Sequence, residues 1–431
     1  MTQSSDTTQA IETVDVFLPG RDGTLLQSPD YDWERIGRVE GHFYRNCRGT
    51  GEIRILVKGA TGDERGEIRA SGDVDMPPSS LWPHDYKGSF GVHTPGMIVT
   101  SKGTVVAICI RRHDSMSDGG HDGDVLTSRS EDGGRTWAPQ AVIFEEKGTL
   151  VYLGSIVEDR ETGTIFVSFW KIPGKVTDDT GYFKTHAAQG GGFFMLKSTD
   201  EGVSWSEPIL INPALNADGW LAWNNNSVHG IQLTGGVHAG RLVIPAFFFK
   251  AGEPGYVEGI RGGLLCSDDH GTSWHAGAVL KEGSDEVALV QTGDDEIYIS
   301  HRMNSLGTGR RHYARSRDGG ETLCEEGEHS DLACRGLHVG LTALDPAGSD
   351  GSPTLLFSNP PGFTMSISAS RDRGATWSAP KPIHTGGKSR YSDLAVNADG
   401  TVLCLYTYGD VRDSEKICVA RFDASWPMAE G

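Results

Sequence analysis

The chain has 431 residues, of which 58 are glycine, and a formal net charge of −19 at pH 7. A chain of this length is longer than a single hydrophobic core usually accommodates, which indicates either two domains or a repeat architecture. Its glycine content, nearly twice the usual ~7%, favours many short strands joined by tight turns. The negative charge argues against nucleic-acid and anionic-membrane partners, and no run in the sequence reaches the ~18–20 apolar residues of a membrane span.

The first 80 residues stand apart from the repeats that follow them. They contain possible strands in VDVFLP and EIRILVKG, and we expect them to supply one strand to the repeat domain or to form a small appendage. The opening residues, MTQSSDTTQAIETVDV, have neither the basic nor the apolar region of a signal peptide. This predicts a cytoplasmic protein, unless a leader has been removed.

Six apolar runs then recur along the chain, most of them opening at glycine, and each reads as a buried central strand. They are GTVVAICIR from Gly103, GTIFVSFW from Gly163, GRLVIPAFFF from Gly240, DEIYISHR from Asp295, SPTLLFS from Ser352 and GTVLCLYTYG from Gly400.

Each of the first five runs is followed, 18 to 35 residues later, by one copy of the box S-x-D-x-G-x-x-W. The copies read SEDGGRTW at 130–137, STDEGVSW at 198–205, SDDHGTSW at 267–274, SRDGGETL at 316–323 and SRDRGATW at 370–377; in the fourth, Leu323 replaces the tryptophan. The aspartate can accept hydrogen bonds from backbone N–H groups of its own turn, and the glycine can adopt the left-handed conformation. The tryptophan can bury its ring beneath the hairpin. No acid, base or nucleophile is paired within the box, so we expect it to be structural.

Six units of strand, strand, box and strand indicate radial repetition. We therefore predict an all-β fold, a six-bladed β-propeller of four-stranded antiparallel blades with Asp-box hairpins. Residues 81–431 would form the propeller and residues 1–80 an N-terminal extension.

The sequence contains no motif for a metal or a cofactor, and we predict neither. Its seven cysteines lack any C-x-x-C pair, and Cys109 and Cys404 stand inside apolar runs, which is typical of small buried residues in a reducing compartment. The expected partner is a small-molecule or glycan substrate. The oligomeric state is not predicted.

Five boxes in six expected blades resemble the sialidase (neuraminidase) superfamily, and the resemblance covers about residues 88–426. It implies a retaining exo-glycosidase that uses a tyrosine nucleophile paired with a glutamate, an aspartate as acid/base, and three arginines that grip the carboxylate of the substrate. Non-enzymatic propellers carry the boxes too, so the site residues have to be matched one by one.

The resemblance assigns the nucleophile to Tyr391 in SRYSDL and its partner to Glu286 in SDEVAL. A phenol of pKa ~10 needs a base to take its proton, and a neutral nucleophile does not repel an anionic sugar acid.

The acid/base would come from the loop RRHDSMSDGGHDGDVLTSRS, where the family spacing favours Asp118, with Asp114 and Asp122 as alternatives. Arg302, at the end of the fourth run, matches a carboxylate-binding arginine. Arg112, after the first run, matches a further arginine of the active site.

The sequence departs from the family at three positions. His93 in VHTP stands where the first arginine is expected, and would supply a positive donor at mildly acidic pH. The position expected for the third arginine falls near Gly362, and no arginine is found there. A glutamate that the resemblance implies is also missing, and Thr407 stands near its position. The substrate is therefore expected to be sialic-acid-like or an otherwise atypical sugar.

Two other functions fit the sequence: a non-hydrolytic glycan-binding propeller, and a lyase or tailoring enzyme for a sugar acid on the same scaffold. Arg310 and Arg311 in GTGRRHYARS are expected on a surface hairpin. The loop from Trp223 either stacks a sugar ring on this tryptophan or is an ordinary loop.

Overall fold

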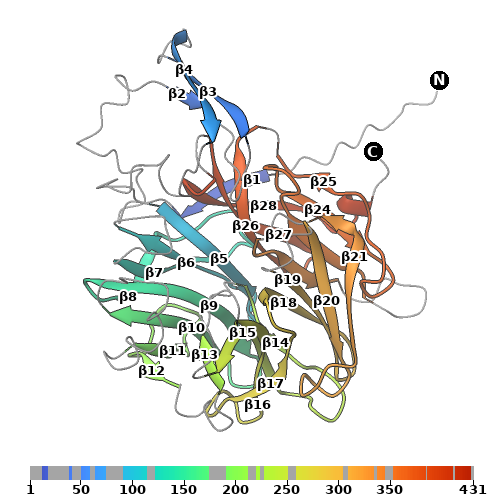
Figure 1. Ribbon diagram of the computed structural model, residues 1–431. Coiled ribbons are helices and arrows are strands. Elements are labelled where there is room, and N and C mark those ends of the chain that lie inside the picture. The colour runs from blue at the N-terminus through green and yellow to red at the C-terminus, as the bar shows by residue number, and fades with distance from the viewer. Residues whose placement is uncertain are drawn as a thin grey trace, which may run out of the picture.

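The computed structural model is almost entirely β-structure, and its strands follow one another in antiparallel sheets along the chain (Figure 1). The residues that it describes are 12–17, 38–40, 50–58, 64–73, 91–113, 122–173, 191–211, 220–223, 228–250, 259–303, 309–333, 337–344, 353–384, 386–410 and 413–428. Within these residues the only helical segment is the short 3-10 turn η1 (Trp426–Met428), and no helix could span a membrane.

The first three blades are formed by the strands between residues 91 and 279. Blade one contains β5 (Gly91–Val99), β6 (Val105–Arg112), β7 (Gly123–Ser130) and β8 (Ala141–Glu145). Blade two contains β9 (Thr149–Asp159), β10 (Thr164–Pro173), β11 (Gly192–Ser198) and β12 (Ile209–Leu210). Blade three contains β13 (Trp220–Trp223), β14 (Ile231–Gln232), β15 (Leu242–Lys250), β16 (Arg261–Ser267) and β17 (His275–Val279); β13 and β14 both pair with β15.

The last three blades follow in the same order. Blade four contains β18 (Ser284–Gly293), β19 (Glu296–Met303), β20 (Arg310–Ser316) and β21 (Glu325–Ala333). Blade five contains β22 (Gly340–Ala343), β23 (Leu355–Asn359), β24 (Ser366–Ser370) and β25 (Lys381–Pro382). Blade six contains β26 (Lys388–Val396), β27 (Thr401–Gly409), β28 (Lys416–Asp423) and β1 (Glu12–Phe17). A further sheet consists of β2 (Arg38–Glu40), β3 (Thr50–Lys58) and β4 (Glu64–Asp73).

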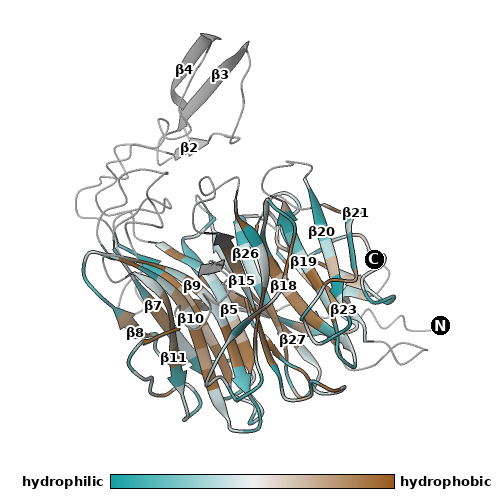
Figure 2. Cartoon of the chain, turned by 60° about the horizontal axis from the view of Figure 1, so that its bottom comes forward, coloured by the Kyte–Doolittle hydropathy of each residue, from teal (hydrophilic) through white to brown (hydrophobic). Residues whose placement is uncertain are grey.

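This arrangement confirms the predicted six-bladed propeller. Each of the six apolar runs forms a central strand of one blade, namely β6, β10, β15, β19, β23 and β27. A central strand lies between two neighbours of its own sheet and under the adjacent blades, so both of its faces are buried and its sequence is continuously apolar. Figure 2 shows these hydrophobic strand interiors between hydrophilic turns.

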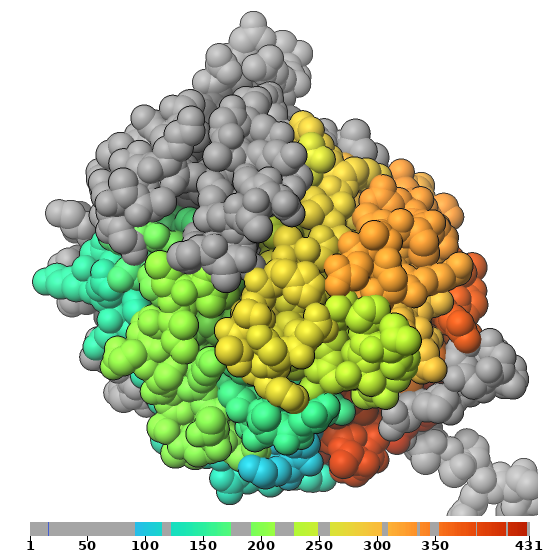
Figure 3. Space-filling view, turned by 90° about the horizontal axis from the view of Figure 1, so that it is seen from below, coloured from blue at the N-terminus to red at the C-terminus, as the bar shows by residue number. Residues whose placement is uncertain are grey.

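The ring closes between the end of the chain and its beginning. The innermost strand β26 of blade six contacts β5 of blade one, and seen from below the last segment lies beside the first described blade (Figure 3). Strand β1 pairs antiparallel with β28 and so completes blade six with residues from the N-terminal part of the chain. The domain boundary at residue 80 remains a prediction.

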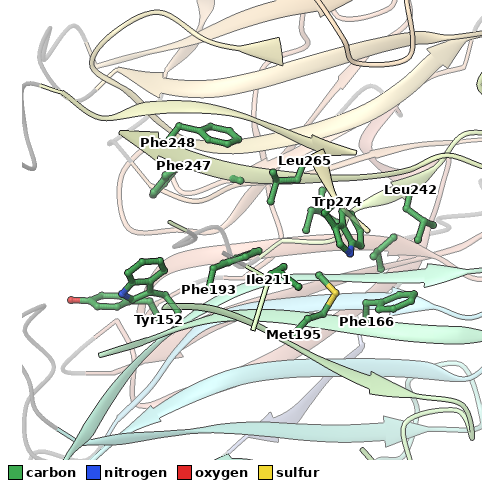
Figure 4. Packing of buried hydrophobic residues seen from close by; sticks show 14 of the residues in the cluster. Tyr152, Phe166, Phe193, Met195, Ile211, Leu242, Phe247, Phe248, Leu265 and Trp274 are labelled. Carbon is green, nitrogen blue, oxygen red and sulfur yellow. The ribbon is translucent and has the colours of Figure 1, made fainter. Parts of the chain in front are cut away.

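Apolar side chains fill the space between neighbouring blades. Figure 4 shows the cluster between blades two and three, where Phe166 and Met195 of blade two lie near Leu242, Leu265 and Trp274 of blade three. Burying one large apolar side chain contributes about 1.5–3 kcal/mol, so such clusters hold successive blades together.

The boxes form the predicted turns. In the first copy, Asp132 Oδ1 accepts hydrogen bonds from the backbone N–H groups of Arg135 (3.0 Å) and Thr136 (2.8 Å). The Ser130 hydroxyl accepts from the N–H of Gly134 at 2.8 Å, and the Trp137 indole donates to the Gly134 carbonyl at 3.2 Å. The box is therefore a structural element, built from local hydrogen bonds.

Candidate active site

The candidate site lies where the innermost strands of different blades begin. His93 is on β5, Glu286 on β18 and Tyr391 on β26, and His338 lies two residues before the start of β22. The first strands of propeller blades line the central axis, so residues at the same end of these strands converge although they are far apart in sequence. All four side chains are buried.

Glu286 occupies an unusual backbone position. The pairing of β18 with β19 shifts register between Asp285 and Ala288, and Glu286 has a φ of 38°, in the left-handed region that glutamate rarely adopts. The fully buried Arg311 supports this bulge, because its guanidinium donates to the Glu286 carbonyl (2.6 Å) and to the Leu337 carbonyl (3.1 Å). The expectation of a surface position for Arg311 is therefore wrong, whereas Arg310 is exposed as expected.

Arg302 is surrounded by carboxylates of the chain itself. Its Nε and Nη2 donate to the two oxygens of Asp285 at 2.6 and 2.5 Å, and its Nη1 lies 2.8 Å from Glu286 Oε2. Burial alone would lower the pKa of Arg302, but Glu286 and Asp285, with a smaller effect of Tyr391, raise it well above its usual value. Burial raises the pKa of the Asp285 carboxyl, while Arg302 acts in the opposite sense. The guanidinium is thus a fixed cation at the site.

Tyr391 is positioned by a second irregular strand. The pairing of β26 with β27 shifts register between Ser389 and Ser392, and the N–H groups of Arg390 (3.1 Å) and Tyr391 (3.2 Å) both donate to the Thr407 hydroxyl. Thr407 stands near the position where the family has a glutamate. Its hydroxyl therefore fixes the backbone of the strand that carries the tyrosine.

Three side chains surround the ring of Tyr391. The His93 ring meets it edge-on at a centroid distance of 4.6 Å, the His338 ring lies 5.1 Å away, and the Arg390 guanidinium lies 4.9 Å from its centroid. His338 also reaches the carboxylate, because its Nε2 lies 3.4 Å from Glu286 Oε1. Tyr391 and Glu286, 105 residues apart in the chain, thus share one neighbour.

Both histidines are neutral in this environment. Burial lowers the pKa of His338 to about 3, with a further contribution from Arg302. Burial, followed by the charges of Arg112, Arg390 and His338, holds the pKa of His93 well below its usual value. The expectation that His93 supplies a positive donor at mildly acidic pH is therefore wrong: it offers a neutral imidazole.

The remaining arginine of the sequence prediction, Arg112, is buried at the end of β6. Its guanidinium lies 5.7 Å from the ring centroid of Tyr152, and its charge acts on His93. It therefore belongs to the same region as His93 and Tyr391.

The place of the absent third arginine is an open position in blade five. A Cβ atom added to Gly362 would meet no heavy atom within 4 Å. The Lys388 ammonium lies 5.8 Å from the ring centroid of the neighbouring Phe363, so one cation of blade six reaches this loop.

Some sequence candidates lie outside the described residues. These are Asp118, the predicted acid/base, and its alternative Asp114. The other alternative, Asp122, is described, and its carboxylate accepts a hydrogen bond from the Gly148 N–H at 3.3 Å. The side chain of Trp223 is also outside them, and its backbone ends β13 opposite Phe247.

Sequence reasoning missed four residues of the site: Asp285, His338, Arg311 and the role of Arg390. Asp285 and Arg390 directly precede the predicted Glu286 and Tyr391, so the same motifs contained them. A signal for His338 was its place two residues before the innermost strand of a blade. Arg311 gave no such signal, because only the tertiary structure brings it under Glu286.

The sequence and the fold of this chain are both similar to those of known proteins. Residues 113–404 match the BNR repeat-like domain, which is more than half of the chain. The chain belongs to this family, within the sialidase superfamily.

A sialidase of Micromonospora viridifaciens is 31% identical over 353 residues, which cover 77% of this chain and 51% of that protein. A sialidase of Bacteroides fragilis is 27% identical over 343 residues, covering 72% of this chain and 59% of that protein. The chain therefore spans between half and three fifths of the length of these two relatives. The solved structure of the Hadza microbial sialidase Hz136 has a TM-score of 0.64 at 22% identity, covers 87% of this chain and 74% of that one, and supports the fold.

Proposed function

We propose that this sialidase-family chain is a retaining exo-glycosidase that acts on a sialic-acid-like or otherwise atypical sugar. The observation that carries the proposal is the contact of Tyr391 and Glu286 with the same buried imidazole, His338. A buried phenol and a buried carboxylate beside one imidazole are what a tyrosine nucleophile needs, because the carboxylate accepts the phenolic proton as the oxygen attacks. Further support comes from the two sialidase relatives.

In the proposed reaction, the Tyr391 oxygen attacks the anomeric carbon while Glu286 takes the phenolic proton. The bond from the anomeric carbon to the leaving oxygen breaks, and that oxygen receives a proton from an acid, for which we keep the prediction of Asp118. The same group then takes a proton from water, whose oxygen displaces Tyr391 from the sugar, and the phenol recovers its proton. Two displacements retain the configuration of the anomeric carbon.

The neighbours of the pair have separate proposed roles. Arg302 fixes Glu286 as a carboxylate through the 2.8 Å contact of its Nη1. Arg390 lies over the ring of Tyr391, where its positive charge favours the phenolate that develops during attack. His93 and His338, both neutral, would bind sugar hydroxyls, because a neutral imidazole has one donor and one acceptor.

The test is turnover on a panel of aryl glycosides that includes sialic acid, other ulosonic acids and neutral sugars. On the substrate with the highest rate, Glu286→Gln should lower kcat by roughly 10²–10⁴-fold, and Tyr391→Phe by at least as much. Tyr313→Phe, on β20 of blade four, is the matched control and should retain the wild-type rate. Equal rates for wild type and Tyr391→Phe on every glycoside would remove the hydrolase proposal.

A glycan-binding propeller without turnover is the second candidate. The observations that favour it are the neutral His93 and the presence of a glycine at position 362, at the two positions where the family resemblance implies arginines. It predicts sugar-dependent thermal stabilisation of the wild type without product, and nearly unchanged binding by Glu286→Gln. The same preparations distinguish it from the hydrolase.

A further inference from the structure

The guanidinium of Arg302 is occupied by a carboxylate of its own sheet. Asp285 and Arg302 are direct cross-strand partners on β18 and β19. Their side chains form a two-point contact, with Nε to Oδ1 at 2.6 Å and Nη2 to Oδ2 at 2.5 Å. Asp285 is fully buried, whereas the Arg302 side chain keeps 21% of its surface exposed. The partly exposed guanidinium therefore has its Nε–Nη2 edge, the edge best suited to bind a carboxylate, already occupied by Asp285.

The geometry of this contact decides what else Arg302 can bind. A guanidinium offers a planar fork that matches one carboxylate at two points. The edge formed by Nε and Nη2 holds Asp285, and the remaining Nη1 faces Glu286 at 2.8 Å. A ligand carboxylate at Arg302 would have to displace Asp285 from a buried position, or lie beside two carboxylates that repel it.

The nearby imidazoles suit hydroxyl groups instead. The Nδ1 atoms of His93 and His338 are buried and have no hydrogen-bond partner among the described residues. Buried polar atoms without partners cost free energy unless a ligand or water satisfies them. A neutral imidazole nitrogen and a sugar hydroxyl can each donate or accept, so the two are complementary.

We propose that Asp285 determines specificity by taking the place of a substrate carboxylate at Arg302, so that the sugar bound there is uncharged at that position and presents hydroxyl groups to His93 and His338. This rests on the proposed function only for the choice of the region around Tyr391 and Glu286 as the sugar site. The prediction concerns binding, and it holds or fails whether or not the chain hydrolyses the sugar.

The test compares two ligands that differ in one group: the methyl α-thioglycoside of N-acetylneuraminic acid, and the same compound with its carboxylate converted to a primary carboxamide. Isothermal titration at pH 7.5 gives the ratio of the two dissociation constants. Because Arg112 and Arg390 also carry positive charge near His93, the change in this ratio on Asp285→Asn isolates Arg302. Asp294→Asn, an exposed carboxylate in the β18–β19 turn, is the matched control.

We expect the wild type to bind the acid and the amide within about threefold of each other, and Asp285→Asn to favour the acid by about tenfold or more, since a freed guanidinium gains a charge-assisted pair. The control should keep the wild-type ratio. A wild type that already prefers the acid tenfold, an unchanged ratio in Asp285→Asn, or no binding of either ligand by either protein would overturn the proposal.

Thermal melting shows whether Asp285→Asn is folded. If it is not, the wild-type ratio alone decides, because a free Arg302 predicts a strong preference for the acid. Absence of turnover together with the expected ratios would remove the hydrolase proposal and leave this one standing.

Discussion

Arg311 holds Glu286 in a conformation that the glutamate would not adopt unaided. A non-glycine residue in the left-handed region costs of order 1–3 kcal/mol and persists only where its surroundings fix it. Here the surroundings are the guanidinium bonds to the carbonyls of Glu286 and Leu337 and a third bond, from Nε to the Ser300 hydroxyl at 2.9 Å. Arg311 acts on Glu286 through the backbone carbonyl, so we regard it as a positioning residue.

Replacing Arg311 with lysine tests this role. The lysine keeps the charge but cannot reach two carbonyls from a planar fork, so we expect the free energy of unfolding to fall by about 1–3 kcal/mol. In a folded variant the misplaced Glu286 should lower kcat with little change in KM, because the base acts in the transition state. Chemical denaturation and steady-state rates measure the two effects.

The matched control is the neighbouring Arg310→Lys. Arg310 is exposed, and surface substitutions usually stay within about 0.5 kcal/mol. Equal unfolding free energies for the two lysine variants would show that Arg311 does not stabilise the bulge.

At the level of elements, the boxes have two roles. Each box closes the turn of its own hairpin, and four of them also form a hydrogen bond to the neighbouring blade. In four copies, the carbonyl of the box residue before the glycine accepts a hydrogen bond from an arginine of the preceding blade. The pairs are Arg421 to Gly133 (3.0 Å), Arg129 to Glu201 (2.6 Å), Arg241 to Gly319 (3.1 Å) and Arg315 to Arg373 (2.7 Å). The box thus links its own hairpin to the blade before it, and Arg421 makes this link across the closure of the ring.

The substitution Arg129→Met tests one such link. Methionine keeps much of the apolar stem but loses the donor, so the Glu201 carbonyl loses its bond to blade one. A hydrogen bond from a charged donor is worth about 1.5–3 kcal/mol, and we expect the unfolding free energy to fall by this amount while KM stays unchanged. Denaturant titration measures it, with the exposed Arg371→Met as the control. Equal stability of the two variants would contradict the interblade role.

The boxes and central strands could be predicted because their causes are local. Asp132 bonds the backbone of its own turn, and the run VVAICIRR of β6 is buried along its whole length, so each leaves a pattern in a short window of sequence. The doubled inner edge of blade three, where β13 and β14 share β15, has no such pattern.

The site was only partly predictable for the same reason. The positions of Glu286 and Tyr391 followed from motifs beside innermost strands. Their contact with His338, and the burial of Arg311, depend on the packing of different blades against one another. Likewise, the neutrality of His93 results from burial and from cations that only the folded ring brings near it.

On the scale of the whole molecule, one buried carboxylate joins three blades. Asp393 of β26 accepts the N–H of Met97 in blade one (2.9 Å) and the N–H of His229 in blade three (3.0 Å). His229 Nδ1 also lies 2.8 Å from Asp393 Oδ1. These contacts join segments that are 164 and 296 residues apart, so Asp393 ties together parts of the propeller that do not adjoin in sequence.

The pair of His229 and Asp393 predicts a pH-dependent stability. Burial would lower the pKa of His229, but Asp393 outweighs this and the pKa is raised. A histidine whose pKa is higher in the folded state binds its proton more tightly there, so its stabilising effect is complete below the unfolded pKa of about 6.5. That effect is lost as the pH rises through the folded pKa. The difference in unfolding free energy between the wild type and His229→Gln should therefore be larger at pH 5.5 than at pH 8.5.

The substitution His384→Gln provides a control of opposite sign. Burial lowers the pKa of His384, so its protonation disfavours the folded state, and its contribution to stability should fall as the pH falls. Denaturant titrations of the wild type and both variants at the two pH values give the comparison, provided that each unfolds in a single transition. Parallel pH trends for the two variants would show that the charge of His229 is not what joins the blades, and that Asp393 acts through its bonds to the backbone alone.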